Sequence, residues 1–387
     1  MDAQSSQLDA PSAAPRDLVR VLLDARKVSD GGIGVYIQNL VRGFAEAGGV
    51  SLTLLVKPGE RPAALAGCSL IVDSSPCYSL DEMLFLARRI PWQRFDLFHT
   101  PHYVLPLGVP IPSVVTVHDL IHVEQPERFF YPWVAKRLMC SAVRRASVVL
   151  AVSEATRQAV IGLAGAEPSK IRRIPNAIAP AFLRGSSVLD LPAVVAEAGS
   201  FFFSLFSNLK PHKGIEDLFE AYRQFKSQGL WRQRSATCPK LVIAGIGADA
   251  IARSPRLAAL VGSIGDIMVL GKVGEGQLAA LYRRAAAVVV ASRLEGFCLP
   301  ALEAQAVGTP VVCRPVPALC ELVTERDVVA ADMSAEGLRD ALAEGLQGAA
   351  AHGRAPYPAH LALYSPARTA AQVVEAYRAA VATEAAR

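Results

Sequence analysis

Short apolar runs recur along this chain, and a segment of helical length separates most of them. The first set lies at Leu18–Arg26, Ser51–Lys57, Asp96–Thr100, Pro112–Asp119 and Ala146–Ser153. A second set lies at Ser200–Ser207, Lys240–Gly247, Asp266–Val273, Ala286–Ser292 and Thr309–Arg314. Runs of this length are typical of buried strands, and helical separations favour βαβ units over hairpins. We therefore predict an α/β chain of two Rossmann-like, doubly wound domains that face a central cleft, with ligands at the carboxyl ends of the strands.

The boundary between the two sets is marked by turn-forming residues. Segment Ile174–Val195 contains three Pro and predicts the linker. We place a disordered lead at residues 1–16, a first domain at 17–182, a second domain at 183–365 and a last helix at 366–387. Within the first domain, Gly31–Gly34 predicts a loop and Val35–Gly48 an amphipathic helix.

Composition excludes several classes of protein. Apolar residues make up 52% of the 387 residues and charged residues 19%, which is not the balance of a disordered chain. The net charge of +5 includes no strongly basic block, so we expect no nucleic-acid partner. The seven Cys contain no C-x-x-C pair, which disfavours a zinc ribbon and a disulfide framework. No run reaches the ~18 residues of a membrane span, and Met1–Arg16 lacks the pattern of a signal peptide. We expect a cytoplasmic protein.

The strongest motif is SRLEGFCLPALEAQAVGTPVV at Ser292–Val312. It predicts a strand, a Gly-containing loop and a helix with Pro300 in its first turn. A helix N-terminus suits an anion, and Glu295 and Glu303 can both face one cleft. Two carboxylates in this arrangement can grip sugar hydroxyls. Taken alone, the two residues could also be one loop glutamate and one surface helix glutamate of an ordinary α/β unit, with no shared ligand.

This motif resembles the E-x7-E signature of retaining glycosyltransferases of family 4, which have the GT-B fold and the pattern EGFGLPxLEAxAxGxPVV. The resemblance implies that the loop backbone of Gly296, Phe297, Cys298 and Leu299 lies against the donor sugar and phosphate. It implies that Glu303 binds the ribose hydroxyls and Glu295 the hexose. Cys298 stands where a second Gly is usual, so its side chain must point away or narrow the pocket.

The resemblance extends upstream. Ser207–Gly214 (SNLKPHKG) is similar to the family's G-R-L-x-P-x-K-G, which implies that Lys213 contacts the donor diphosphate. Asn208 replaces the usual Arg, so the site has one fixed charge fewer. A lone lysine in such a loop is otherwise commonly solvated.

In the first half, the glycine loop and a strand-end histidine match the family. Gly34 and His118 would close the site from the first domain, and His118 would contact the hexose. A lone strand-end histidine is more often structural. The glycines could instead form a dinucleotide-binding loop. This interpretation is disfavoured, because Ile37 occupies the position of the last Gly in that motif and no acidic residue ends the next strand.

The resemblance implies transfer of a hexose from a GDP- or UDP-hexose donor to a saccharide or lipid-linked saccharide, with retention and without a metal or cofactor. Mannose from GDP-mannose is the preferred choice. His118, Glu295 and Lys213 would be the catalytic residues, and the last helix would pack on the first domain. Two alternatives stay open, a nucleotide-sugar epimerase of the same fold and a non-catalytic nucleotide-sugar binding protein. A nicotinamide-dependent dehydrogenase is disfavoured. Aromatic and basic residues in Phe129–Ala146 suit peripheral contact with the inner membrane face, or a core-packed helix with a basic surface.

Overall fold

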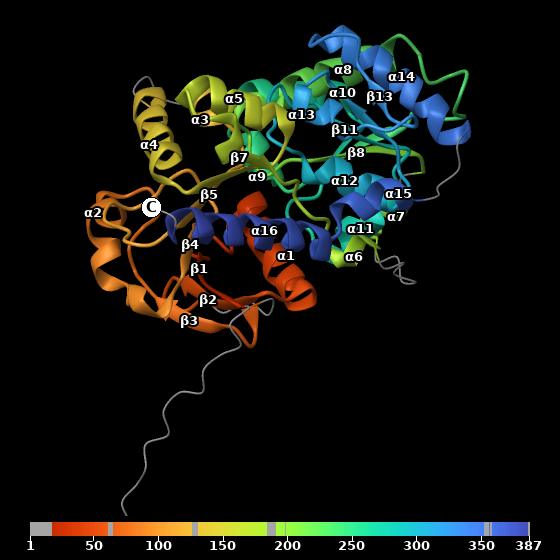
Figure 1. The fold of residues 1–387 in the computed structure, drawn as a ribbon. Helices are drawn as coiled ribbons and strands as arrows, with labels where there is room; N and C mark the ends of the chain where they lie inside the picture. Colours follow the sequence, from red (N-terminus) through yellow and green to blue (C-terminus); the bar gives the residue numbers. More distant parts are fainter. Residues whose placement is uncertain are drawn as a thin grey trace, which may run out of the picture.

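Two parallel sheets in a computed structural model form two lobes of one chain (Figure 1). The structure describes residues 18–60, 65–125, 131–183, 191–197, 199–351, 356 and 358–385. The expected lead at 1–16 lies outside these residues, as do Phe129 and Phe130.

The first sheet has the order β3-β2-β1-β4-β5-β6-β7, with every pairing parallel. Its strands are β1 (Val19–Asp24), β2 (Val50–Val56), β3 (Ser69–Val72), β4 (Leu97–Thr100), β5 (Ser113–Val117), β6 (Val148–Ala151) and β7 (Ile171–Arg173). Its helices are α1 (Gly31–Ala47), α2 (Leu80–Arg89), α3 (Ile121–Glu124), α4 (Tyr131–Arg145) and α5 (Glu154–Ala164). Short 3₁₀ turns at Trp92–Arg94 and Pro168–Lys170 precede β4 and β7.

The second sheet has the order β10-β9-β8-β11-β12-β13 and is also parallel. Its strands are β8 (Phe201–Leu205), β9 (Lys240–Ala244), β10 (Ile267–Val269), β11 (Ala287–Val290), β12 (Val311–Cys313) and β13 (Val328–Val329). The helices of this half are α6 (Pro180–Leu183), α7 (Ala193–Ala196), α8 (Ile215–Ser227), α9 (Ala248–Ala252), α10 (Pro255–Ile264), α11 (Glu275–Arg284), α12 (Leu299–Ala306), α13 (Pro317–Cys320), α14 (Ala335–Ala351) and α15 (Pro358–Leu361). Turns of 3₁₀ helix lie at Pro211–Lys213 and Ala362–Tyr364.

Both faces of each sheet are covered, which explains the uninterrupted apolar runs. On β8, Phe201 and Phe203 face the core beneath α11 and α12, while Phe202 faces the core beneath α8 and α14. In the first lobe, β1 sends Leu23 toward α1 and Leu22 toward the opposite face, which holds part of α4. The two-domain GT-B architecture expected from the sequence is therefore present.

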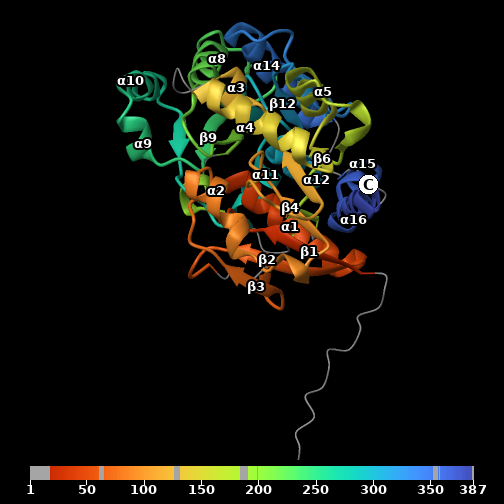
Figure 2. The same ribbon diagram turned by 60° about the vertical axis from the view of Figure 1, so that its left-hand side comes forward.

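The last helix, α16 (Pro366–Ala385), returns to the first lobe and packs along α1 (Figure 1, Figure 2). Its Tyr377 is fully buried, and its hydroxyl lies 2.6 Å from Nδ1 of His99 on β4. The core of the first lobe is thus completed by the last described segment of the chain.

Two segments have a structure other than the one that the sequence predicts for them. Gly31–Gly34 is the first turn of α1 and not a loop, since the Gly34 amide already donates to the Asp30 carbonyl at 2.9 Å. The expected linker contains α6 and α7, and Ile178 and Phe182 from it are buried in the second core. Among the described residues, no helix is long and apolar enough to cross a bilayer.

Candidate functional site

A cavity of about 500 Å³ lies between the lobes, within the range of small-molecule sites. The turns after β5, β8 and β11 line it, together with the first turns of α1 and α12. β8 and β11 are neighbours, but α8 leaves β8 toward one face of the sheet and α12 leaves β11 toward the other. This switch point is where open parallel sheets bind ligands, because diverging chains leave a crevice there.

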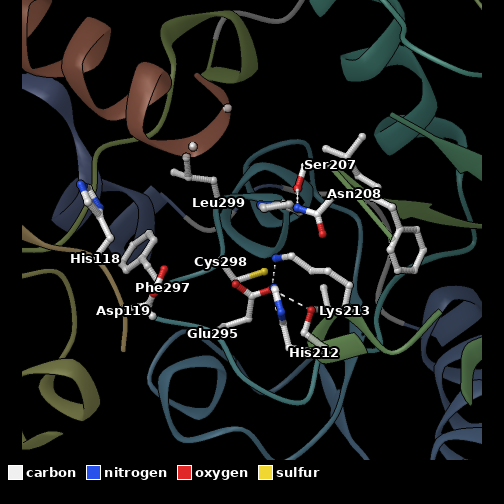
Figure 3. A pocket seen from close by; sticks show the side chains of 18 of the residues that line it. His118, Asp119, Ser207, Asn208, His212, Lys213, Glu295, Phe297, Cys298 and Leu299 are labelled. Carbon is white, nitrogen blue, oxygen red and sulfur yellow. Dashed lines mark hydrogen bonds and ion pairs between the residues drawn. The ribbon is translucent and has the colours of Figure 1, made fainter. Parts of the chain in front are cut away.

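An ion pair forms the floor of the cavity. Lys213 Nζ lies 2.7 Å from Glu295 Oε1, which also accepts a hydrogen bond from Ser292 Oγ at 2.7 Å. Burial alone would lower the pKa of the Lys213 ammonium, but the Glu295 carboxylate outweighs this effect and raises it. Figure 3 shows both side chains pointing toward each other, with the Cys298 sulfur beside them. The site therefore holds a cation beside a carboxylate, a pair that an anionic ligand can rearrange.

Glu303 lies deeper in the cavity wall, on α12. The residue is 7% exposed, and its carboxyl accepts a hydrogen bond from the Tyr282 hydroxyl at 2.9 Å. Burial raises its pKa to about 7, although the Tyr282 hydrogen bond opposes the shift. This carboxyl therefore changes charge near neutral pH.

The loop between β11 and α12 approaches the first lobe closely. A Cβ on Gly296 would lie 1.7 Å from the His118 carbonyl oxygen, so only glycine fits. Cys298 follows with φ of +87°, which is strained for a residue with a side chain. It is buried and lines the cavity, so its thiol occupies space that a glycine would leave open.

His118 lines the cavity from the end of β5. Its Nε2 lies 3.1 Å from the Pro101 carbonyl oxygen, and its ring meets Tyr36 edge to face at 4.9 Å. Burial lowers its pKa to about 4, so the imidazole is neutral at pH 7. A carbonyl can only accept, so Nε2 carries the proton and Nδ1 is left as an acceptor.

Eight of the site residues that the sequence predicts line the cavity from the second lobe. They are Asn208, Lys213, Glu295, Gly296, Phe297, Cys298, Leu299 and Glu303. Asn208 accepts from the Lys210 amide at 3.1 Å and donates to Ser207 Oγ at 3.2 Å. Gly34 is the exception, since it is buried against the Val28 carbonyl, while Gly31 and Gly32 line the cavity.

Three features escaped sequence reasoning. Tyr282 stands 21 positions from Glu303, so no local motif links them. Asn176 lines the cavity, is 5% exposed, and its Oδ1 has no hydrogen-bond partner in the described part of the chain. Glu321, beyond α13, accepts from the amides of Glu154 and Ala155 at 2.8 and 2.7 Å and so caps α5 of the other lobe. Of these three features, only Asn176 had a local signal in the sequence, the Ile-Pro-Asn turn at residues 174–176.

Metal-type ligands gather away from the cavity. Within the described ranges, one group of three comes together, formed by Cys77, Glu82 and His102, and none of the three lines the cavity. The buried Arg26 guanidinium pairs with Glu82 there at 2.5 Å, so a cation already occupies that carboxylate.

Comparisons with known proteins match both halves. A family model described as Glycosyltransferase Family 4 matches residues 30–182, and one described as Glycosyl transferases group 1 matches residues 193–354. The chain is 28% identical to O-antigen chain mannosyltransferase B of Escherichia coli over 63% of this chain and 64% of that protein. It is 32% identical to D-inositol 3-phosphate glycosyltransferase of Kineococcus radiotolerans over 51% of this chain and 46% of that protein. The matched regions thus span about half to two thirds of these relatives.

Solved structures share the whole arrangement of the two lobes. HepE of Anabaena, in complex with UDP and glucose, superposes with a TM-score of 0.65 at 19% identity, covering 95% of this chain and 98% of that one. Sucrose-phosphate synthase of Thermosynechococcus elongatus has a TM-score of 0.63 at 20% identity, covering 95% and 97%. At these identities the likeness establishes the fold.

Proposed function

This chain belongs to the glycosyltransferases of family 4 and has the GT-B fold, and we propose from this premise that it transfers a hexose from a nucleotide-sugar to a saccharide hydroxyl. One observation carries the proposal. Lys213, Glu295 and Glu303 line a single cavity at the switch point of the second sheet, facing His118 of the first lobe. A cation for phosphate and carboxylates for hydroxyls are the groups that a nucleotide-sugar requires.

The donor lies on the second lobe in this proposal. Glu303 accepts hydrogen bonds from the ribose hydroxyls, Lys213 pairs with the diphosphate, and Glu295 with the loop at Gly296–Leu299 holds the hexose. Asn208 faces the same diphosphate without charge, so Lys213 is the principal cation there. Gly34 shapes the turn that closes the site, since Gly31 and Gly32 beside it line the cavity.

Transfer proceeds with retention in this proposal. The acceptor oxygen bonds to the anomeric carbon on the face from which the diphosphate leaves, and its proton passes to the departing phosphate oxygen. Lys213 and the N-terminus of α12 stabilise the charge that develops on the diphosphate. Neutral His118 accepts a hydrogen bond from a hexose hydroxyl at Nδ1, and this hydrogen bond orients the sugar.

We propose that this charge stabilisation needs no metal, because Lys213 is a resident cation. Equal initial rates with EDTA and with added Mg²⁺ or Mn²⁺ would support this. A rate that EDTA abolishes and Mn²⁺ restores would contradict it.

GDP-mannose is our proposed donor, and a saccharide chain, free or lipid-linked, our proposed acceptor. The matches to O-antigen mannosyltransferases support this choice. An epimerase of this fold would convert the donor without releasing free nucleoside diphosphate, and a non-catalytic protein would bind the donor without turnover.

We also propose peripheral membrane contact through α4, for a protein that acts at the inner membrane face. Trp133 is 76% exposed and Val134 49%, and Lys136 and Arg137 on the same helix are exposed. An apolar tip with cations beside it suits an anionic lipid surface. Co-sedimentation with phosphatidylglycerol vesicles at low salt should fall when Trp133 and Arg137 are both replaced by Ser. The control variant, in which Arg253 and Arg256 on the other lobe are both replaced by Ser, should sediment almost as much as the unmodified protein. Equal sedimentation of these two double variants would contradict membrane contact through α4.

The first experiment is a thermal-shift series with GDP, UDP, ADP and their common sugars. A ligand at 100 times its Kd stabilises the fold by about 2.7 kcal/mol, which gives a visible shift. A shift with GDP-mannose that the Lys213→Ala variant loses would support the donor site. No shift with any nucleotide would refute the proposal.

A further inference from the structure

Three aromatic side chains form a row across the carboxyl end of the first sheet. Tyr78 follows β3, Tyr103 follows β4, and His122 lies in α3 after β5. The ring centroids are 5.4 Å apart for Tyr78 and Tyr103, whose planes are inclined by 39°, and 6.1 Å apart for Tyr103 and His122, which meet edge to face. Tyr78 is 39% exposed and the other two are half-buried, so the row offers ring surface to solvent.

The Tyr78 end of the row is held in a strained position. Tyr78 has φ of +65°, and in the described ranges Cys298 is the one other residue besides glycines with positive φ. The Tyr78 amide donates to Glu82 Oε2 at 2.5 Å, and Glu82 Oε1 pairs with the fully buried Arg26 at 2.5 Å. A buried ionic network thus holds the backbone at Tyr78, and strain of this kind persists where the surroundings over-determine it, often at ligand sites.

The row adjoins the cavity. His122 lines the cavity together with Asp119, whose Oδ1 accepts a hydrogen bond from the Ile121 amide at 3.0 Å. Asp119 also lines a second pocket of about 340 Å³, together with Glu124, Gln158 and Glu295. Burial raises the pKa of Asp119, and the carboxylate of Glu295 raises it further.

We propose that the ring faces of Tyr78 and Tyr103, with His122 at their edge, form a platform for a sugar ring of the acceptor, and that this ring carries no phosphate. The inference rests on the proposed function and names the acceptor class. Aromatic faces bind the apolar C–H face of a sugar ring, and the hydroxyls around its edge then reach polar groups at the rim of the platform.

The charges around the platform favour an uncharged ring. Asp119 and Glu124 lie at its cavity side, and carboxylates accept from hydroxyls but repel phosphate. Lys27 lies over the Tyr78 ring at 5.0 Å, but its ammonium pairs with Asp30 at 2.7 Å. A phosphorylated ring would have to displace Asp30 and face Asp119, whereas a neutral ring needs neither change.

The test uses the full chain saturated with GDP, with ligand-observed NMR of methyl α-mannobioside and of mannose 6-phosphate. We expect the neutral disaccharide to bind, and Tyr78→Ala and Tyr103→Ala to weaken that binding about tenfold, the loss of one stacked ring. Tyr78→Phe should retain it, because the ring face stays. Phe85→Ala, which removes an exposed ring on α2, is the matched control and should leave binding unchanged.

The outcomes separate the platform from the donor site. Thermal shifts with GDP in the same samples report the donor site, and their absence would count against the proposed function instead. With GDP bound, no binding of the disaccharide to the unmodified protein would overturn the platform. So would unchanged binding in both alanine variants, or tighter binding of mannose 6-phosphate than of the disaccharide.

Discussion

Replacing Glu303 by Gln should make the protein more stable at pH 8 and change little at low pH. In the folded state burial raises the pKa of this carboxyl to about 7 from an ordinary value of 4.5. The folded protein therefore holds a proton on Glu303 through a range in which the unfolded chain has lost it. Stability from this group is fully present below pH 4.5 and is lost as the pH rises through 7.

The magnitude follows from the size of the shift. A difference between 4.5 and about 7 corresponds to about 3 kcal/mol, at roughly 1.4 kcal/mol for each pH unit. Between pH 5 and pH 8 the unmodified protein should lose about 2 to 3 kcal/mol that a Gln variant does not lose. The Gln amide oxygen can still accept from the Tyr282 hydroxyl, so the hydrogen bond remains in the variant.

Urea unfolding of both proteins in the same buffers from pH 5 to pH 8 measures this effect, because the difference between the two cancels the titration of other groups. Glu344→Gln, on an exposed position of α14, is the matched control and should give a difference that varies little with pH. A difference for Glu303→Gln that is independent of pH would refute the reasoning, since Glu303 would then be ionised at no cost.

Three further substitutions test two contacts between the lobes and the role of His118. Gly296→Ala places a Cβ 1.7 Å from the His118 carbonyl oxygen, so we expect the lobes to separate and turnover to fall at least tenfold. X-ray scattering should then give a larger radius of gyration, and an unchanged radius and rate would contradict this. Glu321→Ala removes two charge-assisted hydrogen bonds to the α5 amides, so it should lower the free energy of unfolding by about 1 to 2 kcal/mol, read from the urea midpoint. His118→Ala should lower kcat more than it raises the donor Kd, and wild-type turnover in this variant would remove His118 from the proposed site.

The fold was largely predictable, because strands buried on both faces leave continuous apolar runs. Phe201–Phe203 shows why, since Phe201 and Phe203 enter one core and Phe202 enters the other, so three apolar residues follow one another. β3, β7 and β13 were not predicted. They are short, and β7 (Ile171–Arg173) contributes two arginines of its three residues. Such strands form because a neighbour supplies hydrogen bonds, which their own residues do not signal.

The second-lobe residues that line the cavity were predictable from local motifs, but the side-chain pairs that they form were not. Lys213 and Glu295 are 82 positions apart, and only the closure of the β8 and β11 turns brings them to 2.7 Å. The start of α1 was mispredicted because glycines usually indicate loops, whereas the Asp30 carbonyl accepts the first helical hydrogen bond from Gly34. Glu321 was missed because its partners are backbone amides of the other lobe, which no side-chain pattern encodes.

The return of α16 to the first lobe has a consequence for biosynthesis. The first lobe is translated first, yet its core stays open until residues 366–385 emerge, because Tyr377 and its neighbours on α16 complete it. The second sheet and its core are finished earlier in the chain, by α15 and the turn Ala362–Tyr364. We therefore expect the later half of the sequence to fold first on the ribosome, with the earlier half exposing the α1 face to chaperones in the meantime.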